Sequence, residues 1–229
     1  MKKTIVIIFG IILFVTSVLA QKSETRKIKP FTKISAFGSL DVLITKGDSN
    51  SVKLESESVN LSNITVENDK NTLKISVTDK LFNKSRNIKV FITYKALNGL
   101  KASGGTYISS KQVVNTDSIE FSAGTGSTID LKIEANSINA DIGEGSTITL
   151  EGTSKTQTIE AGTGGLYNSY DLKCANTTAK VNTGGIIKVA AYESLDAAAS
   201  TGGSISYRGN PKAKKERTSL GGSVEQLVE

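Results

Sequence analysis

The stretch Ala123-Gly124-Thr125-Gly126-Ser127-Thr128-Ile129-Asp130-Leu131 recurs in variant form through the second half of this 229-residue chain. Glycines equivalent to Gly126 follow one another at intervals of 18 to 21 residues, and an apolar side chain comes three positions after each. These glycines are Gly105, Gly145, Gly164, Gly184, Gly202 and Gly221. Self-similarity at this period, with a glycine turn and a fixed apolar position, is typical of stacked repeat proteins.

Apolar residues also precede six of these glycines at alternating positions. The pairs are Leu100/Ala102, Phe121/Ala123, Ala140/Ile142, Ile159/Ala161, Ala179/Val181 and Ala197/Ala199. A period of two indicates strands with one buried face. We therefore predict an all-β chain in which residues 99–229 form a β-solenoid, parallel β-helix-like, with coils of about 20 residues. Its last coil carries Glu216 and Thr218 at the inner pair, a polar substitution expected of a capping tail.

In residues 31–98 apolar and polar residues also alternate, but not in phase with the later glycine repeat. This pattern predicts a β-rich N-terminal lobe, so the expected fold is two-lobed. Residues 39–45 and 51–55 read as a hairpin, residues 64–67 and 72–77 as a second, and residues 88–94 as a further strand. Residues 37–42 align with residues 126–131, which suggests that this lobe opens with a degenerate coil. No flexible spacer separates the lobes, so we expect a shared core.

The N-terminus has the three parts of a secretory signal peptide. Lys2 and Lys3 precede an apolar run, and small residues lead to a cleavage point between Ala20 and Gln21. The alternative is an uncleaved membrane anchor, for which the run is short. We predict an exported protein, in the periplasm, on the outer surface or secreted, with no transmembrane segment after removal of residues 1–20. Residues 21–30 are predicted to be a polar lead-in, with order beginning near Phe31.

The amino-acid composition excludes several kinds of catalytic and metal site. The chain has no His, which removes the usual general base and most transition-metal sites, and its single cysteine, Cys174, excludes thiolate clusters. The formal net charge of +6 falls to +4 without Lys2 and Lys3. Most lysines stand singly between strand residues, so we interpret them as solvated strand faces and expect no nucleic-acid partner. We expect no catalytic residue, cofactor or metal.

Outward positions offer the remaining candidates. The residue four after each anchor glycine is in turn Ser109, Asp130, Thr149, Asn168, Lys188, Ser206 and Glu225. This mixed row has no paired carboxylates, which argues against a catalytic groove. Asp130, Asp141 and Glu144 leave two alternatives open, a carbohydrate-active enzyme and a calcium site. Glycine stretches such as residues 162–165 resemble phosphate-binding loops but precede strands, so we read them as turns.

Hydroxyl, amide and aromatic groups on the predicted outer rows could bind sugars or a partner chain. The candidate ligand-facing residues are Tyr107, Asp130, Asn168, Tyr170 and Tyr207. Exposed polar strands can carry the same residue types without any ligand.

The lobe opening at residues 31–42, the Gly-x-Gly and Gly-Gly-Ser coils, and the ending at residues 202–211 together resemble the bacterial putative auto-transporter adhesin, head GIN domain family. The resemblance covers nearly all of residues 31–229, and Asp141-Ile142-Gly143-Glu144-Gly145 departs from the usual turn. It implies an exported all-β protein of two lobes with an adhesive role, and it leaves room for a homo-oligomer. It carries no catalytic residues. Our first hypothesis is a non-enzymatic cell-envelope or secreted adhesin that binds a surface glycan or protein. A passive structural module remains the third alternative.

Overall fold

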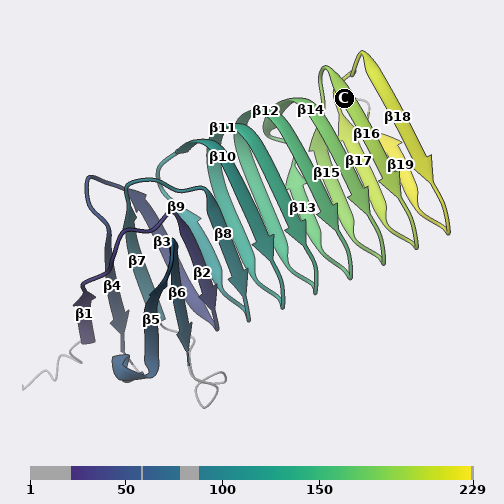
Figure 1. The fold of residues 1–229 in the computed structure, drawn as a ribbon. Coiled ribbons are helices and arrows are strands. Elements are labelled where there is room, and N and C mark those ends of the chain that lie inside the picture. Colours follow the sequence, from purple (N-terminus) through teal and green to yellow (C-terminus); the bar gives the residue numbers. More distant parts are fainter. Residues whose placement is uncertain (1–21, 58, 78–87, 228–229) are drawn as a thin grey trace, which may run out of the picture.

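The computed structural model describes residues 22–57, 59–77 and 88–227. The predicted signal peptide lies outside the described residues. The predicted all-β solenoid is confirmed: two layers of strands face each other, joined at one edge by the glycine turns (Figure 1). We call the strands that lead into the turns the pre-turn layer and those that leave them the post-turn layer. No helix in the described ranges is long and apolar enough to cross a bilayer.

The pre-turn layer runs along the stack in the order β5, β6, β2, β8, β10, β11, β12, β14, β16 and β18. Its bounds are β5 (Ile64–Asp69), β6 (Thr72–Val77), β2 (Lys33–Phe37), β8 (Gly99–Ser103), β10 (Val114–Ala123), β11 (Thr128–Ile142), β12 (Thr147–Ala161), β14 (Leu172–Val181), β16 (Ser194–Ala199) and β18 (Ala213–Thr218). All neighbours pair in parallel except β5 with β6.

The post-turn layer runs in the order β1, β4, β7, β3, β9, the first halves of β11 and β12, β13, β15, β17 and β19. Its remaining bounds are β1 (Lys22–Arg26), β4 (Ser51–Ser56), β7 (Ile88–Tyr94), β3 (Leu40–Lys46), β9 (Tyr107–Ser110), β13 (Leu166–Ser169), β15 (Ile186–Ala190), β17 (Ser204–Arg208) and β19 (Ser223–Gln226). Each of the long strands β11 and β12 bends from one layer into the other.

The turns repeat one backbone geometry. Thr125 and Gly126 both have positive φ, at 51° and 66°, and the same pair of left-handed residues recurs in the following coils. The N–H of Gly126 donates to the carbonyl of Glu144 in the next coil at 3.0 Å, and the N–H of Gly145 donates onward to Thr163 at 3.2 Å. A left-handed conformation costs a residue with a side chain about 1–2 kcal/mol, which this ladder of hydrogen bonds helps to offset.

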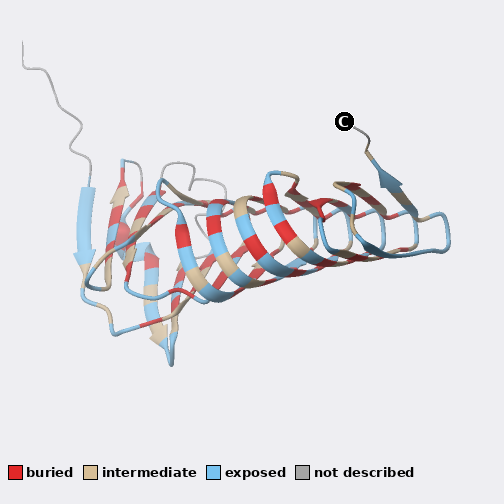
Figure 2. Ribbon diagram, turned by 90° about the horizontal axis from the view of Figure 1, so that it is seen from above, coloured by how far each residue is buried: buried red, intermediate tan, exposed pale blue. Residues whose placement is uncertain are grey.

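The core is a single apolar cluster that runs the length of the stack. Phe121, Ala123 and Ile129 are all buried in it. Buried and more exposed residues alternate along the central strands of the stack (Figure 2). The cluster includes Ile64 of β5 at one end of the stack and Tyr207 of β17 near the other. Pairing of β2 with β8 and of β3 with β9 joins the two halves of the chain. The expectation of a core shared across residues 98 and 99 is therefore confirmed.

The first half differs from the prediction in one pairing. The hairpin of residues 64–67 with 72–77 is confirmed as β5 and β6. The predicted hairpin of residues 39–45 with 51–55 is wrong, because β7 lies between β3 and β4 and pairs with both. The loop residues 47–50 suggested a local turn. Pairing with β7, more than 30 residues along the chain, buries Val42, Ile44 and Val52 instead.

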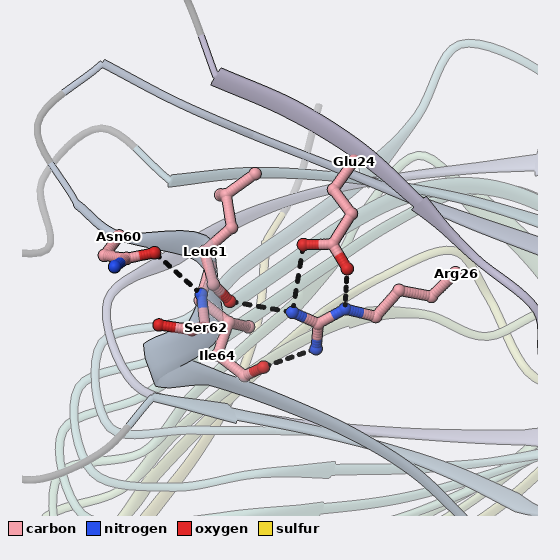
Figure 3. A network of polar contacts seen from close by, with 6 residues as sticks. All are labelled: Glu24, Arg26, Asn60, Leu61, Ser62 and Ile64. Atoms are coloured by element: carbon pink, nitrogen blue, oxygen red, sulfur yellow. Dashed lines mark hydrogen bonds and ion pairs between the residues drawn. The ribbon is translucent and has the colours of Figure 1, made fainter.

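The start of the chain also differs from the prediction. Residues 22–26, expected to be an unordered lead-in, form β1, which pairs antiparallel with β4. The guanidinium of Arg26 donates to the carbonyl of Leu61 at 2.7 Å and to that of Ile64 at 2.5 Å, and it forms an ion pair with Glu24 at 3.0 Å (Figure 3). Leu61 belongs to the 3₁₀ helix η1 (Leu61–Asn63), whose Asn60 cap accepts from the N–H of Ser62. Arg26 thus fastens β1 across the N-terminal end of the stack.

The C-terminal coil ends the stack with polar side chains. Glu216 pairs in register with Ala197, and Thr218 with Ala199. Every residue of β18 is exposed. Charged side chains on an unpaired edge strand disfavour edge-to-edge association, which agrees with the expected capping tail.

The inside of the solenoid contains a small polar network. The Tyr167 hydroxyl donates to the Gln157 side-chain oxygen at 2.9 Å, and the Gln157 amide donates to the Thr177 hydroxyl at 3.0 Å. Ser169 donates to the same Gln157 oxygen at 3.3 Å. All four residues are buried. Burial raises the pKa of Tyr167 well above its ordinary value, and it also raises the pKa of the neighbouring Cys174 thiol.

These buried groups predict loss of stability in alkali. Burial also raises the pKa of Tyr94, whose hydroxyl has no hydrogen-bond partner among the described residues. Below the unfolded-state tyrosine pKa of about 10 the stabilising effect of neutral tyrosine is complete, and it is lost as the pH rises through the folded-state value. We expect the free energy of unfolding to fall above about pH 10. Denaturant titrations across this range should show a shallower fall for Y167F, and an unchanged slope would contradict the assignment.

Candidate functional site

The outer face of the post-turn layer carries a continuous row of polar side chains. Strand register places the residue four after each anchor glycine next to its equivalents in the neighbouring coils, which confirms the row predicted from the sequence. Its members are Ser109, Asp130, Thr149, Asn168, Lys188, Ser206 and Glu225. Because stacked strands lie about 4.8 Å apart, this row presents closely spaced groups of different chemistry.

A second outer row runs beside the first, two residues nearer the turns. It contains Asp41, Tyr107, Thr128, Thr147, Leu166, Ile186, Ser204 and Ser223. Tyr107 and Ile186 are among the few exposed large apolar side chains of the described residues. The two rows together form what we call the outer face of the post-turn layer, a flat surface with isolated apolar groups among hydroxyls.

Tyr107 and Asp130 come together on this face. The Tyr107 hydroxyl donates to a carboxylate oxygen of Asp130 at 3.4 Å, and 39% of the tyrosine is exposed. Partial burial, followed by the charge of Asp130, raises the pKa of Tyr107. The ring is therefore held at the surface as a neutral phenol, with the hydroxyls of Ser109 and Thr128 in adjacent positions of the two rows.

Tyr170 and Asn168 lie further along the same face. The Tyr170 hydroxyl shares a hydrogen bond with the Ser206 hydroxyl at 2.6 Å, and the Arg208 guanidinium lies 4.4 Å from the centre of the tyrosine ring. These contacts leave Tyr170 half-buried. The side-chain oxygen of Asn168 is buried and has no partner among the described residues. Both residues face outward as expected, and Tyr170 already has protein partners.

Tyr207 does not face outward, so this part of the prediction is wrong. It is 1% exposed and occupies an inner position, in register with Val189. Its hydroxyl accepts from the Lys214 ammonium at 2.9 Å and donates to Glu216 at 2.9 Å. The alternation of burial within β17 places Tyr207 two residues after the inner Ile205, a position that the sequence could have identified.

The three candidate carboxylates do not form a site. Asp130 lies on the post-turn layer, whereas Asp141 lies at the other end of β11 in the pre-turn layer. Glu144 is in a turn, where it accepts a hydrogen bond from the Thr125 hydroxyl at 2.5 Å. Among the described residues, no group of three or more carboxylate or thiol residues could hold a metal ion. The geometry gives no support to the enzyme or calcium alternatives.

Sequence comparison identifies the family. The sequence model of the putative auto-transporter adhesin, head GIN domain, matches residues 30–211. The chain belongs to this family. The matched range includes both outer rows up to Ser206 and ends before β18 and β19.

Solved structures share the fold of this head GIN domain. A putative adhesin from Bacteroides fragilis is 23% identical with a TM-score of 0.83, covering 91% of this chain and 97% of its own. A protein from Parabacteroides distasonis described as putative lipid binding is 18% identical with a TM-score of 0.73, and the covered shares are again 91% and 97%. A putative adhesin from Parabacteroides merdae is 14% identical with a TM-score of 0.71, with shares of 91% and 96%. No curated protein matches the chain.

Sequence reasoning missed a hollow at the edge opposite the turns. It has a volume of about 510 Å³, and its lining includes Lys46, Lys95, Asn98 and Thr116. These residues come from β3, the β7–β8 connection and β10, so no local pattern unites them. The one available indication is that residues 95–98 fall outside the repeat.

Proposed function

We propose that this protein is an exported, non-enzymatic adhesin that binds a surface glycan through the outer face of the post-turn layer. Membership of a family described as adhesins supports an exported or surface location and a binding role. The leader-like residues 1–20 agree with export. The absence of convergent carboxylates among the described residues agrees with binding without turnover.

The pair of Tyr107 and Asp130 is the observation that carries this proposal. A half-exposed aromatic ring offers an apolar surface to the C–H groups of a sugar, and the fixed hydroxyl and carboxylate offer hydrogen bonds to its hydroxyls. Neighbouring Thr128 and Ser109 extend the hydrogen-bonding groups along two rows. A repeating surface of this kind suits a repeating polymer, because successive coils present equivalent positions at a constant spacing.

Replacement of Tyr107 tests the proposal. On an array of bacterial-envelope and host-surface glycans, we expect saturable binding by the parent and about tenfold weaker binding by Y107A, equivalent to 1.4 kcal/mol. Y107F keeps the ring and loses the bond to Asp130, so it should fall between the two. Tyr192 is also exposed, at 46%, and lies in the connection between β15 and β16, so Y192A is the matched control.

The outcomes separate the alternatives. Equal loss with Y107A and Y192A, or no array binding at all, would contradict glycan recognition by this face. Binding to an envelope protein with the same dependence on Tyr107 would support the outer face as the binding surface and would identify a protein, not a glycan, as the ligand. Release of sugar products, abolished by D130N, would instead establish an enzyme.

A further inference from the structure

The hollow opposite the turns has features of a separate binding site. It lies at the edge where β7 connects to β8, and its lining includes lysines, amides, hydroxyls and two carboxylates beside the apolar Ala96 and Leu97. The candidate residues on the outer face of the post-turn layer do not line it. Its volume of about 510 Å³ is within the range of about 300–1,000 Å³ typical of small-molecule sites.

The path of the chain explains why a hollow forms here. In the regular coils the backbone at this edge pairs with that of the next coil, as residues 114–116 pair with residues 133–135. The connection from β7 to β8 passes from the level of β7 to that of β8, while β2 and β3 lie between them in the stack. Residues 95–98 therefore cannot continue the regular closure. Thr116 of β10 links the regular coil to this connection, because its hydroxyl donates to the Leu97 carbonyl at 2.8 Å.

Two lysines in the lining have unpaired ammonium groups. Among the described residues, no hydrogen bond or ion pair engages the side chain of Lys46 or Lys95. Their backbones are fixed, because the Lys46 N–H donates to the Gln112 side chain at 3.1 Å and the Lys95 N–H donates to that of Asn50 at 3.0 Å. The two unpaired ammonium groups therefore extend from fixed backbone positions beside the same hollow.

The two carboxylates of the lining are both engaged. Glu120 forms an ion pair with Lys33 at 2.6 Å, and Asp117 accepts a hydrogen bond from the Asn136 amide. The Lys33–Glu120 pair crosses over Gly99, the residue between them in register, whose missing side chain leaves the space. A Cβ on Gly99 would lie 2.9 Å from Lys33 Cγ. The neutral Asn136 amide does not neutralise Asp117, but with three lysines and two carboxylates the lining still has a net charge of +1.

We propose that this hollow binds an acidic sugar, with Lys46 and Lys95 pairing with its carboxylate. The hydroxyl of Ser118 and the amide of Asn98 have no partner among the described residues, and they supply hydrogen bonds to the sugar hydroxyls. The lining has no arginine, so its lysines act on an anion as point charges and not through the paired hydrogen bonds of a guanidinium. It also has no aromatic ring on which a nucleic-acid base could stack.

Trigalacturonate is a suitable probe, with galactotriose as its neutral counterpart. By calorimetry at low salt, we expect the parent protein to bind trigalacturonate and not galactotriose. K46Q/K95Q should weaken this binding about tenfold, and added salt should weaken it as well. The matched control is K155Q/K173Q, which removes the same charge from two lysines of later coils that lie outside both outer rows and outside the hollow, and that have no side-chain partner among the described residues.

A change of opposite sign sharpens the test. E120Q removes the carboxylate that occupies Lys33, so trigalacturonate should bind several-fold more tightly. E160Q is its control, because Glu160 forms a comparable cross-coil ion pair with Lys180 at 3.2 Å, away from the hollow.

Several results would overturn the proposal. They are no binding of trigalacturonate, equal weakening by both lysine pairs, equal tightening by both glutamate variants, and equal binding of galactotriose. Stronger binding of a sulfated or phosphorylated oligosaccharide at the same lysines would also overturn the assignment to carboxylates. Because Tyr107 does not line this hollow, loss of glycan binding through the outer face should leave these results unaffected.

Discussion

G152A is expected to reduce the free energy of unfolding by about 3 kcal/mol or more. Gly152 lies where β12 bends between the layers, with a φ of 121°, a conformation that residues with side chains rarely adopt. A Cβ there would lie 2.1 Å from the carbonyl oxygen of Ile133 in the preceding coil. This contact is with backbone, so no change of side-chain rotamer relieves it. Denaturant titration of the purified variant measures the loss.

G126A is the control that separates backbone strain from the steric contact of the added Cβ. Gly126 has a φ of 66°, and a Cβ there meets nothing within 4 Å. Only backbone strain should act, at a cost of about 1–2 kcal/mol. Equal losses for G126A and G152A would show that the close approach of neighbouring coils at the bend contributes nothing, and would contradict the packing described for β11 and β12.

Q157L should cost about 2 kcal/mol although it places an apolar side chain at a buried position. The loss arises because the Tyr167 hydroxyl, fully buried, loses the acceptor that it reaches at 2.9 Å. Removing one partner of a buried hydrogen bond leaves the other with its full desolvation penalty. The fluorescence-monitored unfolding midpoint should fall accordingly.

The double variant Q157L/Y167F should recover part of that loss. With the hydroxyl removed as well, no unpaired phenol remains in the core, so the two changes together should cost less than the sum of the single changes. Y167F alone leaves Gln157 with its bonds to Ser169 and Thr177 and should be the mildest of the three. Additive losses would show that Tyr167 and Gln157 are not energetically coupled.

The solenoid half of the fold could be predicted from the sequence because its interactions repeat locally. The spacing of Gly126 and its equivalents fixes the length of each coil, and alternation at pairs such as Phe121 and Ala123 fixes the inner side. Register then follows, because each coil pairs with a copy of itself 18 to 21 residues away. The polar row that includes Asp130 was predictable for the same reason.

The first half was harder to predict because its pairings are not local. Placement of β7 between β3 and β4 depends on contacts between segments more than 30 residues apart, which no turn residue indicates. β1 was missed because its residues are mostly exposed and follow no apolar pattern. The hollow with Lys46 and Lys95 has the same origin, since it forms where a connection skips a level of the stack. Tyr207 was predicted to face outward because tyrosines often bind ligands at surfaces. The alternation of its strand, in which it lies two residues after the inner Ile205, places it inside.

The central claim is that recognition resides in the outward residues while the glycine-defined coils supply only geometry. A glycan array with the double variant Y107S/D130S, compared with the parent at matched thermal stability, tests it most directly. Both residues lie outside the core cluster, so melting should be unchanged while the parent's glycan binding is lost. A variant that melts like the parent and keeps the parent's array pattern would contradict the claim.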